Sequence, residues 1–316
     1  MKRWYSPLVG LAVVCLASAC ALREIPYPEL RADYGLPSSQ TFVASPGVNV
    51  HYTDEGRSKG RVIILVHGFA ASVHAWRPWI DRLKDDYRLI AIDLPGHGLT
   101  ETPPGYQASL EGNAALVDAL AAKLGVEHFV LAGNSMGGAV SLSYAMTHQD
   151  KLDGLVLVDA AGWPGDGSRG GPPAFVGLLN NGVGRLLMKM ADPRMFAVDG
   201  LKSAYVDETL VTEQVIDRYV DFAMGQGHRD VLLTQRSQPE RAWTKADFAS
   251  IDVPTLVMVG AKDALIPPSD SKAIANAIPG AYIVSYPEGG HLPMEQLPDE
   301  TVRTLRAFLQ GLPARR

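Results

Sequence analysis

The stretch that decides the fold is Leu131-Ala132-Gly133-Asn134-Ser135-Met136-Gly137-Gly138. It follows an apolar run over residues 128–131 that predicts a buried strand, and it precedes residues 139–145, which have the composition of a helix. A G-x-S-x-G pattern between a strand and a helix predicts a sharp turn that exposes the serine at the edge of a sheet. Such a turn requires small flanking residues, and Gly133 and Gly137 meet that requirement. The alternative is an ordinary Gly/Ser turn, which the flanking strand and helix disfavour.

The predicted turn also has an electrostatic consequence. It places the backbone amide of Met136 in the first turn of a helix, where N–H groups are unpaired and the helix dipole favours negative charge. This environment suits an oxyanion that forms when Ser135 attacks a carbonyl group. A serine hydroxyl is a poor nucleophile by itself, so the chain must also supply a base, and the base needs a carboxylate to orient it.

Strand-like runs alternate with helical patterns on both sides of this turn. A Pro-Gly pair divides residues 41–53 into an antiparallel hairpin at a sheet edge. Further strands are predicted over residues 62–66, 88–92, 155–158, 254–259 and 281–286, with helical patterns between them. Alternation of this kind predicts a mainly parallel sheet with right-handed crossovers.

The alternation is interrupted once. Residues 162–173 are rich in glycine and proline and predict a flexible linker, and the pattern from residue 174 to 249 is helical. Since strands resume afterwards, we interpret residues 163–249 as a helical cap over the active edge of the sheet and not as a separate domain. Residues 41–162 and 250–316 then form the two parts of one core. The apolar positions of the first amphipathic stretch of the cap are Leu178, Leu179, Val183, Leu186, Leu187 and Met190.

The N-terminus has the features of an export signal. Met1-Lys2-Arg3 is basic, residues 8–19 are apolar, and small residues precede Cys20. We therefore predict a signal peptide over residues 1–19 and a tether over residues 20–40. The segment ending at Cys20 resembles a bacterial lipobox, which implies a lipidated cysteine. Ala21 in place of an aspartate after the cysteine resembles lipoproteins sent to the outer membrane. Ordinary cleavage, giving a periplasmic or secreted protein, and an uncleaved anchor remain alternatives.

Composition excludes several classes of function. The chain has 316 residues, enough for one large α/β domain, and a net charge of −5 with no Lys/Arg-rich run, so it has no electrostatic basis for binding nucleic acid. No G-x-G-x-x-G pattern follows a strand and no residue cluster has metal-ligand spacing, so we expect no cofactor and no metal. The composition does not predict the oligomeric state.

Two further residues complete a candidate catalytic set with Ser135. Asp263 and His291 each follow a predicted strand, and the order serine, aspartate, histidine is the one that α/β-hydrolases use. His291 would act as base and acid, and Asp263 would fix its tautomer. His67 is the rival for the base, and Asp159, which also ends a strand, is the rival for the acid.

From residue 41 to residue 310 the chain resembles the α/β-hydrolase superfamily. The matching segments are His67-Gly68-Phe69, residues 93–98, residues 133–138, residues 260–263 and residues 290–295. The resemblance implies a mostly parallel eight-stranded sheet flanked by helices, with a cap inserted after the sixth strand. It also implies that the amides of Phe69 and Met136 form the oxyanion hole.

The resemblance further narrows the expected chemistry. Ser135 at the turn excludes the epoxide hydrolases and haloalkane dehalogenases, which carry aspartate there. The segment Leu292-Pro293-Met294-Glu295 is similar to that of esterases and lipases. We expect a serine hydrolase that cleaves small-molecule or lipid carboxylic esters through an acyl-enzyme. The alternatives are a carbon–carbon bond hydrolase of the meta-cleavage type, a haloperoxidase-like perhydrolase and a non-catalytic binding protein.

Overall fold

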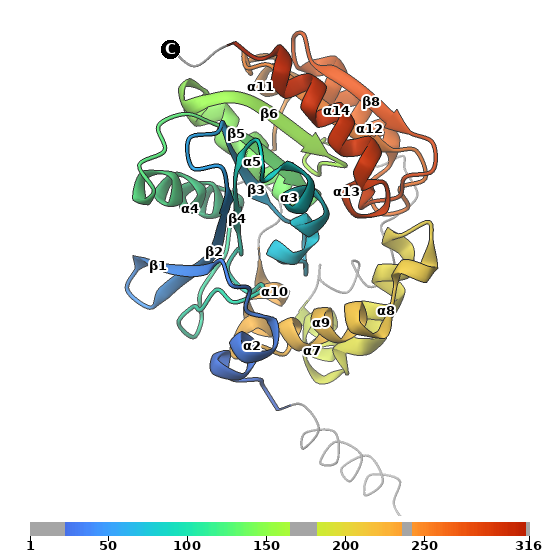
Figure 1. Cartoon of the computed structure of the whole chain (residues 1–316). Coiled ribbons are helices and arrows are strands. Elements are labelled where there is room, and N and C mark those ends of the chain that lie inside the picture. The colour runs from blue at the N-terminus through green and yellow to red at the C-terminus, as the bar shows by residue number, and fades with distance from the viewer. Residues whose placement is uncertain (1–22, 165–181, 236–241, 314–316) are drawn as a thin grey trace, which may run out of the picture.

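The computed structural model describes residues 23–164, 182–235 and 242–313. Within these ranges, eight strands form one sheet in the order β1-β2-β4-β3-β5-β6-β7-β8 (Figure 1). The pairs β1–β2 and β2–β4 are antiparallel, and the remaining pairs are parallel, so the predicted mostly parallel sheet is confirmed. The strands are β1 (Ser39–Ser45), β2 (Val48–Gly56), β3 (Val62–Val66), β4 (Arg88–Ile92), β5 (Phe129–Asn134), β6 (Leu152–Val158), β7 (Thr255–Gly260) and β8 (Tyr282–Tyr286).

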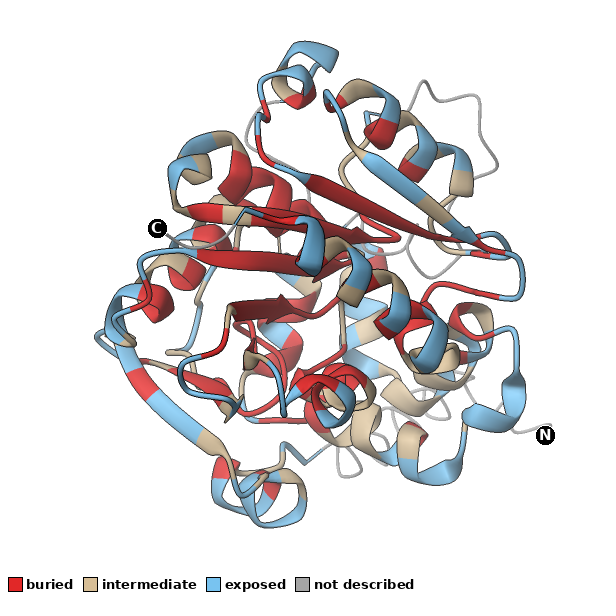
Figure 2. Ribbon diagram, turned by 45° about the horizontal axis from the view of Figure 1, so that its top comes forward, coloured by how far each residue is buried: buried red, intermediate tan, exposed pale blue. Residues whose placement is uncertain are grey.

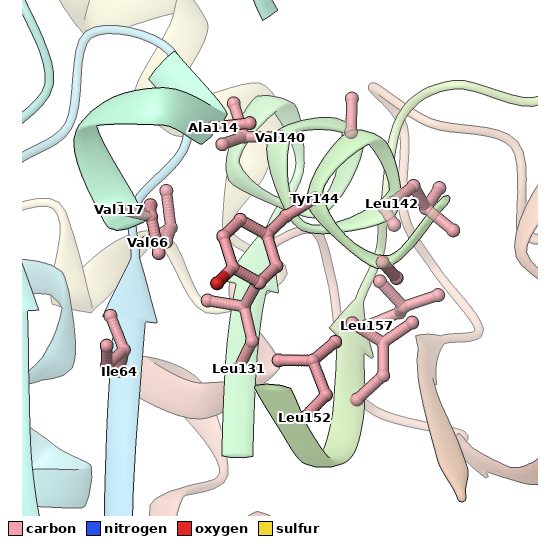
Figure 3. Packing of buried hydrophobic residues seen from close by; sticks show 14 of the residues in the cluster. Ile64, Val66, Ala114, Val117, Leu131, Val140, Leu142, Tyr144, Leu152 and Leu157 are labelled. Atoms are coloured by element: carbon pink, nitrogen blue, oxygen red, sulfur yellow. The ribbon is translucent and has the colours of Figure 1, made fainter. Parts of the chain in front are cut away.

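Helices cover both faces of this sheet. On β3, Ile64 and Val66 pack into one cluster with helices α4, α5, α11 and α12, whereas Ile63 and Leu65 pack into another with α3 and α14. Figure 3 shows the first cluster, where the labelled side chains lie between the strands and two helices. The helices are α3 (Arg77–Leu83), α4 (Leu110–Lys123), α5 (Met136–His148), α11 (Lys245–Ala249), α12 (Pro268–Ala277), α13 (Pro293–Gln296) and α14 (Pro298–Gly311).

Burial explains why the sequence pattern differs between strands. Every residue of β3, β5 and β7 is buried, because helices cover both faces of the central strands (Figure 2). These strands therefore read as continuous apolar runs. The edge strands β1 and β8 have few buried residues, and Val43 on β1 and Tyr282 on β8 are exposed. Burial of each central aliphatic side chain stabilises the fold by about 1.5–3 kcal/mol. The central strands, whose ends carry the candidate site, are therefore firmly held in the core.

A group of helices lies between β6 and β7. The described part of this insertion consists of α7 (Gly182–Met190), α8 (Pro193–Ala204), α9 (Glu213–Ala223) and α10 (His228–Thr234), followed by α11. The helices α7 to α10 lie together on one side of the molecule (Figure 1). Residues 165–173 of the expected linker, together with Leu178 and Leu179, lie outside the described residues.

The segment before β1 differs from the expected tether. Residues 27–34 form helix α2 (Tyr27–Tyr34), whose Tyr27 and Leu30 are buried against the insertion. Pro26 and Pro28 stand at the start of this helix, where a missing N–H costs nothing. The backbone of Ile25 pairs with Met224 and Gln226, which extends the attachment.

Residues 1–22, including the expected signal peptide and Cys20, lie outside the described residues. Among the residues that are described, no helix is long and apolar enough to cross a bilayer.

Candidate active site

Ser135 lies at a strained turn between β5 and α5. Its backbone has φ 53° and ψ −119°, a left-handed conformation that costs a non-glycine residue on the order of 1–3 kcal/mol. The surrounding backbone holds this conformation. The Ser135 amide donates to Val158 O at 3.1 Å, and the Ala161 amide donates to Ser135 O at 2.9 Å. The turn predicted from the G-x-S-x-G pattern is present.

The glycines of this turn are required by close contacts with backbone. A Cβ added to Gly133 would lie 2.1 Å from Gly137 O, and one added to Gly137 would lie 2.2 Å from Val66 O. Neither backbone oxygen can move without displacing a strand or helix. Only glycine therefore allows α5 to approach β3 and β5 this closely.

His291 and Asp263 form a buried hydrogen-bonded pair. The Nδ1 atom of His291 donates to Asp263 Oδ2 at 2.7 Å, and the two residues are 5% and 7% exposed. The other carboxylate oxygen accepts from the amides of Leu265 at 2.7 Å and Ile266 at 3.0 Å, which holds the Asp263 side chain in place. Because Nδ1–H donates a hydrogen bond to the carboxylate, this tautomer leaves Nε2 free to accept a proton.

Asn134 connects the turn to the loop that carries His291. Its Nδ2 atom donates to His291 O at 3.0 Å and to Val158 O at 3.1 Å, while its buried Oδ1 has no partner. The ends of β5 and β6 and the His291 loop are thereby joined through one side chain. Asn134 directly precedes Ser135 in the G-x-S-x-G pattern, but the pattern itself predicts no role for the residue at that position.

The rival base, His67, has another role in the structure. It is fully buried, its Nδ1 donates to Gly68 O at 2.7 Å, and its Nε2 accepts from the Leu94 amide at 3.0 Å. Both nitrogens are thus occupied, and burial lowers the pKa of the ring. The imidazole ties the Gly68 loop to the end of β4.

The Gly68-Phe69 loop lies directly against Ser135. A Cβ added to Gly68 would lie 3.1 Å from Ser135 Cβ, and Ala70 has φ 58°. Met136 is the first residue of α5, so its amide lies at the helix N-terminus. The loop and the helix therefore border the same turn from two sides.

The rival acid, Asp159, lies beside Asp263 but does not contact His291 in the described hydrogen bonds. Its carboxyl accepts from the Gly260 amide, at 2.9 Å to Oδ1, and its backbone has φ 43°. Burial, together with the charge of Asp263, raises the pKa of Asp159 well above its ordinary value. The raised pKa favours the protonated form of Asp159, while Asp263 is the hydrogen-bond partner of His291.

The inserted helices also contribute to the site. The His291 amide donates to Ala204 O, at the end of α8, at 2.9 Å. The Gln235 side chain, just after α10, contacts the Met136 sulfur, and its buried Oε1 has no hydrogen-bond partner among the described residues. These residues have no motif around them, so sequence reasoning could not find them.

The strained serine turn and the buried histidine–aspartate pair lie at the ends of parallel strands. A model of the alpha/beta hydrolase family matches residues 63–304. The chain belongs to the alpha/beta hydrolase family. Lipase 1 of Psychrobacter immobilis is 29% identical to this hydrolase over 307 residues, which cover 95% of the chain and 92% of the relative.

Two more relatives show the range of this similarity. The 2-hydroxy-6-oxononadienedioate/2-hydroxy-6-oxononatrienedioate hydrolase of Comamonas testosteroni is 25% identical over 250 residues, covering 77% of this chain and 84% of the relative. The crystal structure of a membrane phospholipase A, described as a bacterial virulence factor, has a TM-score of 0.72 at 26% identity and covers 96% of this chain and 97% of that one. The alpha/beta-hydrolase resemblance seen in the sequence is confirmed.

Proposed function

We propose that this hydrolase cleaves carboxylic esters, with Ser135, His291 and Asp263 as its catalytic triad. The observation that carries the proposal is the location of Ser135 at a strained turn joined through Asn134 to the loop of His291, which is itself bonded to Asp263. This arrangement supplies a nucleophile, a base and the carboxylate that orients the base.

In the proposed reaction, His291 Nε2 accepts the Ser135 proton while Oγ attacks the ester carbonyl carbon. The amides of Phe69 and Met136 stabilise the oxyanion, and donors of this kind each contribute about 3–4 kcal/mol in other enzymes. The C–O bond to the alcohol breaks, and His291 protonates the departing oxygen. Water, deprotonated by His291, then attacks the acyl carbon. The bond to Ser135 Oγ breaks, His291 returns the proton to Oγ, and the carboxylic acid is released.

Two relatives support esters as the substrate class. One is a lipase and another is a membrane phospholipase A, and both resemble nearly the whole chain. We further propose that the protein is exported and anchored to the outer membrane through a lipid on Cys20, because of the N-terminal pattern described above. A lipid-anchored hydrolase would meet ester substrates at a membrane surface.

A carbon–carbon bond hydrolase is a second candidate. The relative from Comamonas testosteroni, a hydrolase that resembles 77% of this chain, supports it. The esterase proposal is preferred because the lipase resembles a larger share of the chain, 95% against 77%.

The test is hydrolysis of a panel of p-nitrophenyl esters, from acetyl to palmitoyl, by the full chain and by Ser135→Ala. We expect the variant to lose roughly 10³-fold or more in kcat while remaining folded. Absence of hydrolysis by the folded parent chain would refute the ester proposal. Activity on a vinylogous 1,5-diketone would then support carbon–carbon bond cleavage.

A further inference from the structure

Helix α7 carries an apolar stripe that faces away from the protein. Val183, Leu186, Leu187 and Met190 are 71%, 57%, 57% and 49% exposed, and their spacing places them on one side of the helix. We call these four residues the α7 stripe. Single exposed apolar residues are common on protein surfaces, but a stripe of four on one short helix marks a surface that contacts something apolar.

The other side of α7 is fastened to α10. The Arg229 guanidinium, on α10, donates to Met188 O at 2.8 Å and to Ala191 O at 2.5 Å, and Gly184 is buried. Lys189 of α7 also forms an ion pair with Asp230 of α10. These contacts fix which side of α7 points outward, so the exposure of the stripe follows from the packing of the helix.

The N-terminal segment is attached next to the same pair of helices. The Gly227 amide, at the start of α10, donates to Glu24 Oε1 at 3.2 Å, and the Ile25 amide donates to Met224 O at 2.8 Å. Figure 1 shows α2, α7 and α9 at one end of the molecule, away from α14 and β8. The chain therefore enters the fold beside the α7 stripe.

Chain length then limits how far this end can be from a membrane. The stretch from Cys20 to Ile25 spans at most about 18 Å even when fully extended. If the chain is held at the bilayer surface at Cys20, Ile25 lies within that distance of the lipid. The start of α10 is hydrogen-bonded to the neighbouring Glu24, and α7 packs on α10. A lipid surface is therefore the apolar partner within reach of the stripe.

We propose that the α7 stripe lies in the interfacial layer of the bilayer to which the N-terminal segment anchors the chain. An amphipathic helix with one apolar side binds at this depth without crossing the membrane. The inference deepens the proposed function and rests on its membrane anchor. It implies that the substrate is a lipid ester taken from the bilayer and not one dissolved in water.

Contact with lipid can be measured without relying on activity. The full chain carrying Ser135→Ala is bound to vesicles of phosphatidylethanolamine and phosphatidylglycerol, with an environment-sensitive fluorophore on Leu186→Cys. Val43→Cys, at a similarly exposed residue on β1, is the matched control, and any signal of the parent chain treated with the same fluorophore is subtracted. We expect a blue shift and quenching by nitroxide lipids at position 186 only. The proposal is wrong if adding vesicles leaves the emission at position 186 unchanged from that of the water-exposed fluorophore. It is also wrong if the blue shift appears without vesicles and depends on the protein concentration, which would indicate contact with a second copy of the chain.

The functional consequence is tested in the active chain. The double variant Leu186→Glu/Leu187→Glu is compared with Val43→Glu on a soluble p-nitrophenyl ester and on a phospholipid in vesicles. We expect the double variant to lose about tenfold on the vesicle substrate only, because charge opposes insertion. An equal loss on both substrates, or no loss on vesicles, contradicts the inference. If the parent hydrolyses neither ester, the proposed function fails, while the fluorescence result still decides whether α7 contacts lipid.

Discussion

The side-chain amide of Asn134 donates a hydrogen bond to the backbone carbonyl of His291, with 3.0 Å between the two atoms. A second hydrogen bond from the same nitrogen reaches Val158 O at 3.1 Å. One residue therefore holds the loop of the proposed base against the end of the strand that carries the proposed nucleophile. The position of His291 depends on a polar contact that lies outside the triad itself.

We predict that Asn134→Ala lowers kcat by about 10–100-fold while KM stays within about twofold. The variant removes the support of the His291 loop and changes no residue proposed to bind the substrate. The matched control is Asn113→Ala on α4, another buried asparagine, whose side-chain atoms have no hydrogen-bond partner in the structure. Steady-state kinetics on one ester checks both variants. A wild-type kcat in Asn134→Ala, or a similar loss in the control, would count against this positioning role.

The two buried carboxyls should respond differently to amide substitution. Asp263→Asn should lower kcat by about 10⁴-fold, as in other triads that lose the correct histidine tautomer. Asp159→Asn should change kcat less than about threefold, because His291 is bonded to Asp263 and an amide oxygen at position 159 can also accept from the Gly260 amide. The comparison decides between the two candidate acids. If Asp159→Asn shows the larger loss, the assignment of Asp263 is wrong.

The same substitution at Asp159 has a consequence for stability. Its folded-state pKa is raised by burial and by Asp263, so its stabilising contribution is complete at low pH and is lost as pH rises above the unfolded value near 3.8. Asp159→Asn removes this loss. We therefore expect a higher free energy of unfolding than wild type at neutral pH and a smaller difference near pH 4, measured by urea unfolding. A variant destabilised to the same extent at both pH values would contradict this.

Glu295 should make stability depend on pH in a range that experiments can reach. Burial raises its pKa from 4.5 to about 7, against the opposing effects of a Tyr205 hydrogen bond and the Arg218 charge. The contribution of the protonated form is complete below about pH 4.5 and disappears as pH rises through 7. Relative to Glu295→Gln, wild type should lose about 1–3 kcal/mol of unfolding free energy over this range. If the difference in unfolding free energy between wild type and Glu295→Gln stays constant from pH 4.5 to 8, the prediction is wrong.

Two glycines in helices should respond in opposite directions to alanine. A Cβ on Gly137 would lie 2.2 Å from Val66 O, so Gly137→Ala should destabilise the fold by about 1–3 kcal/mol. A Cβ on Gly200, inside α8, would meet nothing within 4 Å, so Gly200→Ala should stabilise by about 0.5–1 kcal/mol. Thermal unfolding of both variants provides the measurement. A gain in stability for Gly137→Ala would mean that α5 can move away from β3.

The sequence predicted the core and the residues of the proposed triad because their signals are local. A strand covered on both faces, such as β3, must be apolar throughout. The sharp turn requires glycine at two positions for steric reasons, and this requirement produces a pattern within five consecutive residues. Asp263 and His291 could be chosen since parallel strands bring their carboxyl ends to one edge.

What the sequence could not predict depends on contacts between distant residues. The segment before β1 has the prolines of a tether, yet Tyr27 and Leu30 find an apolar surface on the inserted helices and form α2. The bond from Asn134 to His291 joins residues 157 positions apart. No periodicity or motif encodes such a pair, so only the folded chain reveals it.

The hydrogen bond from the His291 amide to Ala204 O restricts how this protein can be re-engineered or diversify. A replacement cap transplanted from another hydrolase would keep the histidine in place only if its own helix ended at the same point with an unoccupied carbonyl. Chimaeras spliced within α8 should therefore lose turnover even when they fold, whereas exchanges that leave Ala204 and its peptide intact should preserve it. Evolution of new substrate ranges on this core is therefore constrained at the Ala204 peptide, whatever changes elsewhere in the insertion.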